Sequence, residues 1–247
     1  MSINLCIDWG NTNIKAAVIQ DDKIQKQVSC TEANALEMVS SLISLYQPEY
    51  GIMSAVAKHS DQFVSLVKSK VKHFIKVDGY TKTPINNAYL SADTLGADRL
   101  ALVVGAYMLH GGKDNLVVSL GTCITYNLIQ QNKTFRGGAI SPGLHMRLKA
   151  MHKFTDGLPE VKPDEDALLL GYDTETCLQS GATNGMAAEI DGMITTYSEK
   201  YTDFNAILTG GDAPLFARKL KSKIFADPDL LLKGLNLILN YNVASSR

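Results

Sequence analysis

Apolar residues in this 247-residue chain form short runs that end at glycine-containing turns, and longer stretches with helical spacing. Near the N-terminus, apolar runs at 3–7 and 16–19 flank the polar segment 8–15. This pattern predicts two strands joined by a tight glycine turn. A third strand is expected at 23–28, so the chain begins with three strands in succession.

Helices and strands then alternate. Apolar residues spaced three and four apart predict helices over 32–46 and 62–71. A buried strand at 51–57 lies between them in the sequence, and a short strand is expected at 74–77.

Residues 78–95 contain Gly79, Pro84 and a pair of asparagines, which predicts a long loop. Long loops within compact domains are often functional. A strongly apolar helix follows over 95–110, and the pair Gly111 and Gly112 ends it.

The second half of the chain repeats the order of the first. The expected elements are strands at 115–120 and 122–130, a third strand near 134, a strand at 204–209 and a closing helix from about 230. A long helix is also expected, with its clearest part at 186–200 and its start near 174.

The strand, Gly/Thr turn and strand pattern therefore occurs twice, with Gly10 to Thr12 in the first copy and Gly121 and Thr122 in the second. A third glycine turn, Gly210 and Gly211, follows the last predicted strand, where it could admit a base or ribose. We predict an α/β fold of two ribonuclease-H-like (actin-like ATPase) lobes, 1–112 and 113–247, with a nucleotide cleft between them.

Composition narrows the class of protein. The formal net charge is −1, so no strong field attracts nucleic acid or an anionic membrane. The four cysteines are widely spaced and form no CxxC pair, which argues against structural zinc or a disulfide framework. No signal peptide or membrane-spanning run is recognisable. We expect a cytoplasmic enzyme or binding protein.

Residues 8–15, Asp-Trp-Gly-Asn-Thr-Asn-Ile-Lys, combine groups that suit a nucleotide phosphate. Gly10 permits close approach of the backbone, and Asn11, Thr12 and Asn13 offer amide and hydroxyl groups. Lys15 can add a positive charge, and Asp8 can hold hydrated Mg²⁺. An ordinary polar hairpin is the alternative interpretation.

The sequence Gly96-Ala97-Asp98-Arg99 lies where the long loop enters an apolar helix. A carboxylate near a helix N-terminus is stabilised by the helix dipole, and Asp98 could accept a proton there. Arg99 could bind a phosphate or orient Asp98. The alternative is an ordinary first-turn charge with a solvated neighbour.

Residues 136–143, Arg-Gly-Gly-Ala-Ile-Ser-Pro-Gly, predict a second glycine-rich loop that leads into a helix. Such a loop allows close approach to a ligand, or it simply crosses the surface. No GxSxG, HExxH or P-loop lysine motif is present, which disfavours serine hydrolases, zincins and P-loop enzymes.

Taken in order, these motifs resemble those of the type III pantothenate kinases. The resemblance rests on Asp8-x-Gly-Asn-Thr-x-x-Lys15, Gly96-Ala-Asp-Arg99, Gly121-Thr122, Gly137-Gly-x-Ile-x-Pro-Gly143 and Thr209-Gly-Gly-x-Ala213. It implies ATP-dependent phosphorylation of pantothenate to 4′-phosphopantothenate, the first step of coenzyme A synthesis, by positioning and charge neutralisation.

The resemblance also implies roles for individual residues. Asp98 would be the general base, and the substrate site would be formed by Tyr89, Gly96, Ala97, Asp98, Arg99 and a partner subunit's counterpart of Thr174 in a homodimer. ATP would be bound by Asp8, Trp9, Gly10, Asn11, Thr12, Asn13, Ile14, Lys15, Thr122, Gly210 and Gly211. Mg²⁺ and a monovalent cation, K⁺ or NH₄⁺, would be cofactors.

Two positions depart from the family pattern. Ser119 stands where an aspartate usually coordinates the monovalent cation, and Asn127 replaces an acidic residue. The loss of two negative charges predicts weak or absent activation by K⁺.

Three rival functions remain open at this stage. They are a catalytically weakened paralogue that binds ATP as a regulator, a sugar or small-acid kinase of the same superfamily, and an actin-like assembly protein. The retained Asp98 and Arg99 favour the pantothenate kinase.

Overall fold

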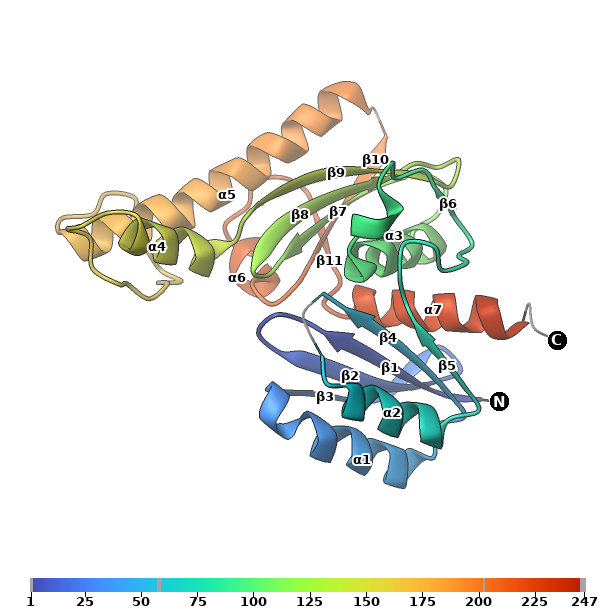
Figure 1. Cartoon of the computed structure of the whole chain (residues 1–247). Helices are drawn as coiled ribbons and strands as arrows, with labels where there is room; N and C mark the ends of the chain where they lie inside the picture. Colours follow the sequence, from blue (N-terminus) through green and yellow to red (C-terminus); the bar gives the residue numbers. More distant parts are fainter. Residues whose placement is uncertain (1, 57–58, 202, 245–247) are drawn as a thin grey trace. The chain divides into compact units, whose positions relative to one another are not determined.

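A computed structural model describes residues 2–56, 59–201 and 203–244 of the chain (Figure 1). The chain folds as two compact units. The first is formed by Met1–Gly111, Ile129–Arg136 and Asp229–Arg247, and the second by Gly112–Leu128 and Gly137–Pro228. The lobe boundary expected between residues 112 and 113 stays a prediction.

The first unit contains a five-stranded sheet in the order β3-β2-β1-β4-β5. Its strands are β1 (Ile3–Trp9), β2 (Ile14–Gln20), β3 (Lys23–Cys30), β4 (Tyr50–Ala55) and β5 (His73–Lys76). The first three strands are antiparallel, and β4 and β5 run parallel to β1. The predicted strands are confirmed, although Ala57 of the predicted strand 51–57 lies outside the described residues.

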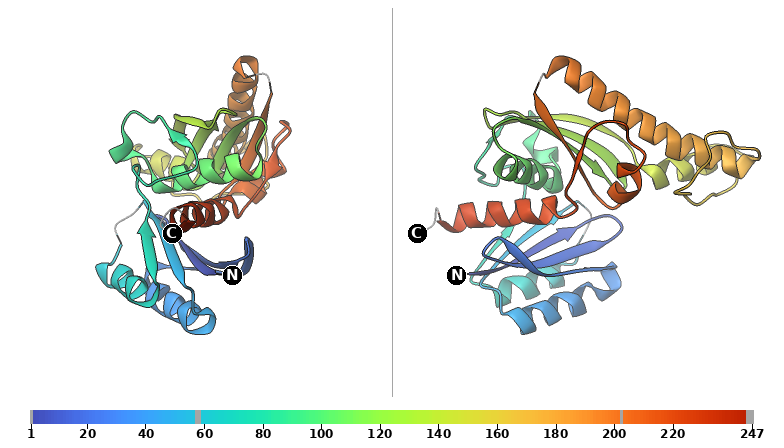
Figure 2. Two further views of the ribbon diagram at one scale, coloured as in Figure 1. Left: turned by 90° about the vertical axis from the view of Figure 1, so that its right-hand side faces the viewer. Right: turned by 180° about the vertical axis from the view of Figure 1, so that it is seen from behind.

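Helices α1 (Ala35–Tyr46) and α2 (Asp61–Lys70) cover one face of this sheet (Figures 1 and 2). Alternate strand residues such as Leu5 and Ile7 pack with Phe63 into a buried cluster on that side. The period-two pattern of a strand therefore fixes which side chains form this core.

The opposite face of the sheet carries helix α7 (Leu230–Ala244), near the end of the chain (Figure 2). The Asn4 side chain of β1 donates a 2.7 Å hydrogen bond to Oδ1 of Asn236. Helix α7 also crosses α3 (Ala97–Leu109) closely, because a Cβ atom on Gly234 would lie 2.0 Å from the Ala101 carbonyl oxygen. A glycine is therefore needed at this helix crossing.

A six-stranded sheet has the order β11-β10-β7-β8-β9-β6. Its strands are β6 (Asn86–Asn87), β7 (Asp114–Leu120), β8 (Cys123–Ile129), β9 (Thr134–Pro142), β10 (Phe204–Thr209) and β11 (Phe225–Ala226). Apart from β6, its order 11-10-7-8-9 repeats the 5-4-1-2-3 order of the first sheet. This repeat confirms the duplicated strand pattern in the sequence.

The second unit adds helices α4 (Leu144–Lys153), α5 (Thr174–Lys200) and α6 (Ala213–Ala217). The apolar side of α5 packs with the strands through buried residues such as Met186 and Ile190. In Figure 1, α5 begins beyond the edge of the sheet, beside α4.

Two regions differ from the expected elements. Residues 136–142 form most of strand β9, so the predicted glycine-rich loop is wrong there, although the expected helix does follow. A Cβ atom on Gly138 would lie 1.8 Å from the Tyr126 carbonyl oxygen. The glycine thus marks close packing of neighbouring strands. The long connection before α3 contains β6 and a short 3₁₀ turn, η2 (Ala92–Thr94).

Among the helices that the structure describes, none combines the length and the apolar character required to cross a lipid bilayer.

Candidate functional site

The predicted phosphate loop is the turn between β1 and β2. The backbone N–H of Gly10 donates a 3.2 Å hydrogen bond to the Asn13 carbonyl oxygen. A Cβ atom on Gly10 would lie 2.9 Å from that oxygen, so a side chain there would force the turn to shift. Asn11, Thr12 and Asn13 are exposed. The turn therefore presents two amides and a hydroxyl, which suit phosphate oxygens.

The residues at either end of this turn anchor it in the core. Trp9 and Ile14 are each 2% exposed. The Trp9 indole packs edge-on against Phe63, with ring centroids 4.8 Å apart. Any contact of Trp9 or Ile14 with a ligand would therefore come through the backbone.

Asp8 lies near the end of β1 between two neighbouring strands. It is directly opposite Lys15 on β2 and Ser54 on β4, and Ser54 donates a 2.8 Å hydrogen bond to its Oδ1. Burial raises the pKa of Asp8 to about 6, and the charge of Asp98 adds to this rise, while Ser54 and Lys15 oppose it. Its environment thus favours a nearby positive charge.

Asp98 is the second residue of α3. A Cβ atom on Gly96 would lie 2.5 Å from Oδ1 of Asp98, so the glycine makes room for this carboxylate. Burial raises the pKa of Asp98, against the effects of the Arg99 backbone N–H and the Arg99 charge. A carboxyl group of reduced acidity, held in place by the first turn of a helix, is suited to accept a proton.

Asp8 and Asp98 belong to the same unit and influence each other electrostatically, because the charge of Asp98 raises the pKa of Asp8. The fold therefore brings the predicted phosphate loop and the Gly-Ala-Asp-Arg motif into one region, although ninety residues separate them. Two neighbouring carboxylates favour binding of a cation.

Arg99 is held among aromatic rings. Its guanidinium carbon lies 5.3 Å from the centre of the Tyr89 ring and 6.0 Å from that of Phe135, and those two rings stack with their centroids 6.1 Å apart. The Tyr89 hydroxyl lies 3.4 Å from Arg99 Nη1. Only 6% of Arg99 is exposed, so its planar group has a fixed orientation. Phe135 lies in no motif of the sequence, so its contact with Arg99 could not be predicted from it.

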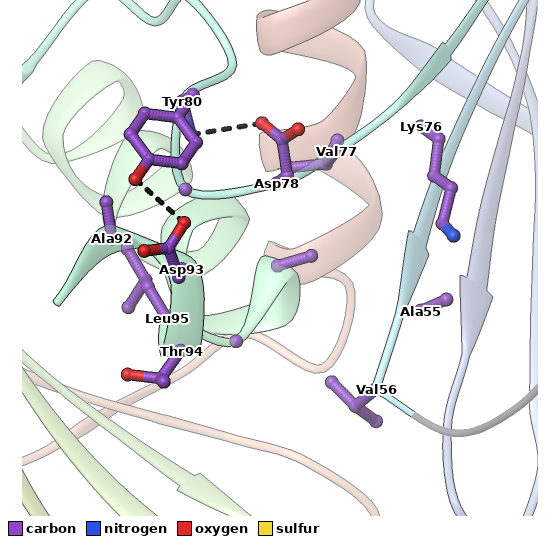
Figure 3. Close-up of a pocket in the computed structure, with 13 residues that line it drawn as sticks. Ala55, Val56, Lys76, Val77, Asp78, Tyr80, Ala92, Asp93, Thr94 and Leu95 are labelled. Atoms are coloured by element: carbon purple, nitrogen blue, oxygen red, sulfur yellow. Dashed lines mark hydrogen bonds between the residues drawn. The ribbon is translucent and has the colours of Figure 1, made fainter.

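A hollow of about 440 Å³ adjoins this motif, and Figure 3 shows the residues around it. It lies at the carboxyl ends of β4 and β5, where Ala55 and Lys76 contribute to its lining together with Gly96 and Ala97. The Tyr80 hydroxyl donates a 2.8 Å hydrogen bond to Asp93, and both residues line the hollow. Ligands commonly bind at the carboxyl ends of parallel strands.

In the second unit, three backbone segments meet at the Gly121–Thr122 turn. The N–H of Gly143 donates to the Thr122 carbonyl oxygen at 3.1 Å, and that of Asp212 donates to the Leu120 carbonyl oxygen at 3.2 Å. The segments lie so close that a Cβ atom on Gly210 would be 2.2 Å from the Leu120 oxygen. The structure thus joins Thr122 and the Gly210–Gly211 turn in one cluster.

Ser119 and Asn127, which stand where the resemblance led us to expect acidic residues, differ in their surroundings. Ser119 is half-buried near the end of β7, opposite Thr209 of β10. Asn127 is fully buried, and its Nδ2 donates a 3.0 Å hydrogen bond to Thr125 Oγ1. The Val117 carbonyl oxygen also lies 3.5 Å from this nitrogen. The amide nitrogen therefore faces a hydroxyl and a carbonyl oxygen, and the carbonyl oxygen requires a donor.

Thr174 is exposed at the first turn of α5. A capping box defines this helix start, because Asp173 accepts a 2.8 Å hydrogen bond from the N–H of Thr176 and the Thr176 hydroxyl accepts one from the Asp173 N–H. This end of α5 lies away from the sheet of its own unit (Figures 1 and 2).

Within residues 2–56, 59–201 and 203–244, no group of three or more His, Cys, Asp or Glu side chains could hold a metal ion. A hydrated Mg²⁺ needs fewer protein ligands, since it commonly binds through one or two carboxylates and substrate phosphates. Asp8, with its raised pKa beside an exposed polar turn, fits that requirement.

Comparison with known proteins decides the family. A sequence profile described as type III pantothenate kinase matches residues 4–196. Proteins named type III pantothenate kinase from Christiangramia forsetii and Cytophaga hutchinsonii are 39% and 40% identical to it, each over 241 residues. The alignments cover 97% and 98% of this chain and 99% and 100% of those relatives. This chain belongs to the type III pantothenate kinase family.

Solved structures support the fold. A Campylobacter jejuni protein assigned to a Baf family of transcriptional activators has a TM-score of 0.63 and 22% identity, covering 97% of this chain and 99% of its own. An inorganic polyphosphate/ATP-glucomannokinase from Arthrobacter has a TM-score of 0.51 and 14% identity, covering 98% and 100%. These similarities show the fold alone, that of actin-like ATPases and sugar kinases. Nothing in them favours the regulatory alternative.

Proposed function

We propose that this protein transfers the γ-phosphoryl group of ATP to the 4′-hydroxyl of pantothenate, the first step of coenzyme A synthesis. The observation that carries the proposal is the Asp98 carboxylate, held at the start of α3 beside Arg99 and electrostatically coupled to Asp8. Membership of the family supports the same reaction.

In the proposed reaction, Asp98 accepts the proton of the pantothenate hydroxyl as the hydroxyl oxygen attacks the γ-phosphorus. The bond from that phosphorus to the β–γ bridging oxygen breaks, and ADP leaves. Burial raises the pKa of Asp98, which makes its carboxylate a stronger proton acceptor. Phosphoryl transfer otherwise depends on positioning and charge neutralisation.

The nucleotide would be bound by polar turns in each unit. We assign ATP binding to Asp8, Trp9, Gly10, Asn11, Thr12, Asn13, Ile14, Lys15, Thr122, Gly210 and Gly211. Asp8 would hold Mg²⁺ through water, and that ion would supply positive charge near the phosphates.

The substrate site would comprise Tyr89, Gly96, Ala97, Asp98 and Arg99. Pantothenate carries a carboxylate, and a planar guanidinium can pair with a carboxylate through two hydrogen bonds. The Tyr89 and Phe135 rings, which we call the aromatic clamp, contact Arg99 and support this role, because they fix the plane of the guanidinium before the substrate arrives.

We further propose a cytoplasmic homodimer in which the partner subunit's Thr174 completes the pantothenate site. The exposed position of Thr174 at one end of a 27-residue helix supports this arrangement. A monovalent cation, K⁺ or NH₄⁺, would bind at the position of Ser119, weakly because the hydroxyl is neutral.

The deciding experiment is ATP-dependent phosphorylation of pantothenate by the purified protein, with and without K⁺ or NH₄⁺, beside Asp98→Asn. Turnover by the wild type that falls on the order of a thousandfold in Asp98→Asn supports the kinase and its base. Folded wild-type protein that binds ATP without turnover in any salt would instead favour a regulatory protein.

A further inference from the structure

A partly buried polar network connects four elements of the second unit beside the Gly121–Thr122 turn. Glu189 of α5 accepts a 3.1 Å hydrogen bond from the Tyr126 hydroxyl on β8 and forms an ion pair with Arg147 of α4. Arg147 Nη2 also lies 3.2 Å from the Ser141 hydroxyl on β9. The ion pair is largely shielded, because 20% of the Arg147 side chain and 28% of the Glu189 side chain are exposed.

Arg147 holds the end of β9 through the backbone as well. Its Nε donates a 2.8 Å hydrogen bond to the Pro142 carbonyl oxygen, and its own N–H donates a 3.0 Å bond to the Gly143 carbonyl oxygen. The guanidinium can contact Glu189, Ser141 and the Pro142 carbonyl oxygen together because its N–H donors have a fixed fork geometry. The bond from the Arg147 backbone N–H is an ordinary backbone bond at the start of α4.

The segment held in this way rests directly on the Gly121–Thr122 turn. The Gly143 N–H donates to the Thr122 carbonyl oxygen at 3.1 Å. A Cβ atom on Gly143 would lie 2.1 Å from the Gly121 carbonyl oxygen. With so little free space, a shift of Pro142 or Gly143 would be transmitted to the turn.

Electrostatics favours the charged form of the pair. Burial opposes ionisation of Glu189, but Arg147, Ser141 and Tyr126 together lower its pKa. Burial and the neighbouring Glu189 charge raise the pKa of Tyr126, so its hydroxyl remains a donor. The network therefore stays intact across the neutral pH range.

We infer that Arg147 and Glu189 are positioning residues that fix the Gly121–Thr122 turn for ATP through Pro142 and Gly143. The inference rests on the proposed function, in which Thr122 contacts ATP. Neither residue would touch the substrates, so their loss should weaken ATP binding more than pantothenate binding.

Three variants separate positioning from general stability. Arg147→Lys keeps a positive charge for Glu189 but loses the Nε donor to Pro142. Arg147→Met removes both interactions, and Glu189→Gln removes the ion pair while keeping the shape of the side chain. Glu165→Gln is the matched control, because Glu165 pairs with Arg218 at 3.0 Å in the same unit where both side chains are mostly exposed.

The kinetic readout is the KM for ATP, set against the KM for pantothenate and the melting temperature. We expect the KM for ATP to rise on the order of tenfold in Arg147→Lys and Arg147→Met, with the KM for pantothenate within about twofold. Arg147→Lys should keep most of the thermal stability that Arg147→Met loses. A KM for ATP that follows the melting temperature through the series would overturn the inference.

Amide hydrogen exchange at Gly143 tests the same contact without enzyme activity. Exchange should accelerate on the order of tenfold in Arg147→Lys and stay unchanged in Glu165→Gln. Unchanged exchange in all Arg147 and Glu189 variants would refute the positioning role. Wild-type protein that neither binds ATP nor phosphorylates pantothenate would refute the proposed function, and Gly143 exchange would still decide whether the pair holds the turn.

Discussion

The Ser54 hydroxyl donates a 2.8 Å hydrogen bond to Oδ1 of Asp8, across adjacent parallel strands. Ser54 is fully buried, so its hydroxyl has little freedom to turn away. It fixes the orientation of a carboxylate that we assign to Mg²⁺, and it opposes the rise in the Asp8 pKa.

Ser54→Ala should therefore lower kcat about tenfold and raise the Mg²⁺ concentration needed for half-maximal rate, because the carboxylate becomes less ordered and more easily protonated. The measurement is a Mg²⁺ titration of the phosphorylation rate. Ser40→Ala is the control. Among its described contacts, the exposed Ser40 hydroxyl donates only to the Leu36 carbonyl oxygen within α1. Equal titration curves for Ser54→Ala and the wild type would rule out the orienting role.

The raised pKa of Asp8 gives stability a defined pH dependence in the absence of Mg²⁺. The folded protein holds the Asp8 proton up to about pH 6, whereas the unfolded chain releases it near 3.8. The Asp8 contribution to the free energy of unfolding therefore falls as pH rises from about 4 to about 6, and stays lower above that range.

Asp8→Asn should remove this penalty and stabilise the metal-free protein at pH 7.5 by about 2 to 3 kcal/mol, because tenfold tighter proton binding corresponds to about 1.4 kcal/mol. Urea unfolding at pH 4.5 and 7.5 measures the effect, which should be much smaller at the lower pH. A gain of the same size at both pH values would contradict the assigned titration. The variant should also lose kinase activity.

The aromatic clamp predicts which change at Arg99 matters. Arg99→Lys keeps the charge but loses the planar group that lies over Tyr89 and Phe135, so the KM for pantothenate should rise about ten- to hundredfold. Tyr89→Phe keeps the ring and loses only a 3.4 Å hydrogen bond, so its effect should stay within about threefold. Steady-state kinetics with each substrate varied makes the comparison, and a larger effect in Tyr89→Phe would show that the hydroxyl dominates.

Cation dependence follows from the neutral side chain at position 119. We expect weak or absent activation of the wild type by K⁺, and stronger activation at lower K⁺ concentration in Ser119→Asp, because the variant supplies an anionic oxygen ligand. Titration of activity with KCl at constant ionic strength tests this. Tight and strong activation of the wild type would refute the prediction.

Asn127→Asp should behave differently, although it also adds a negative charge. The Asn127 amide donates to Thr125 Oγ1 in a fully buried site beside the Val117 carbonyl oxygen. A carboxylate at this position would no longer offer a donor to the Val117 carbonyl oxygen and would place a charge in a fully buried site, so the free energy of unfolding should fall by about 2 to 4 kcal/mol. Thermal unfolding of Asn127→Asp beside Ser119→Asp would measure the difference, and an unchanged melting temperature in Asn127→Asp would contradict it.

The elements that sequence could predict share strong local patterns. The runs before Gly10 and before Gly121 are almost wholly apolar and end at a turn, so strand, turn and strand follow from adjacent residues. The apolar spacing over 95–110 predicts helix α3 equally clearly, although the helix begins at Ala97, after a separate 3₁₀ turn. The chemistry of Asp8 and Asp98 was suggested by their place at these boundaries.

The features that sequence missed depend on contacts between distant residues. Gly137 and Gly138 suggested a loop, but Gly138 allows β9 to pack closely beside Tyr126 of β8. Phe135 reads as an ordinary strand residue until the fold places it under Arg99. Ser54 is one polar position in a buried run, and its function depends on the register between β1 and β4.

The close packing of α7 on α3 at Gly234 has a consequence for folding during synthesis of the chain. Asp8 and Asp98 leave the ribosome early, yet the helix that packs on both α3 and β1 is made from residues 230–244. The first unit cannot complete its core until residues 230–244 have emerged. A kinase truncated before residue 230 would keep every proposed active-site residue. It would lack the helix that packs on β1 and α3, the elements that carry Asp8 and Asp98, so catalysis requires that α7 be translated.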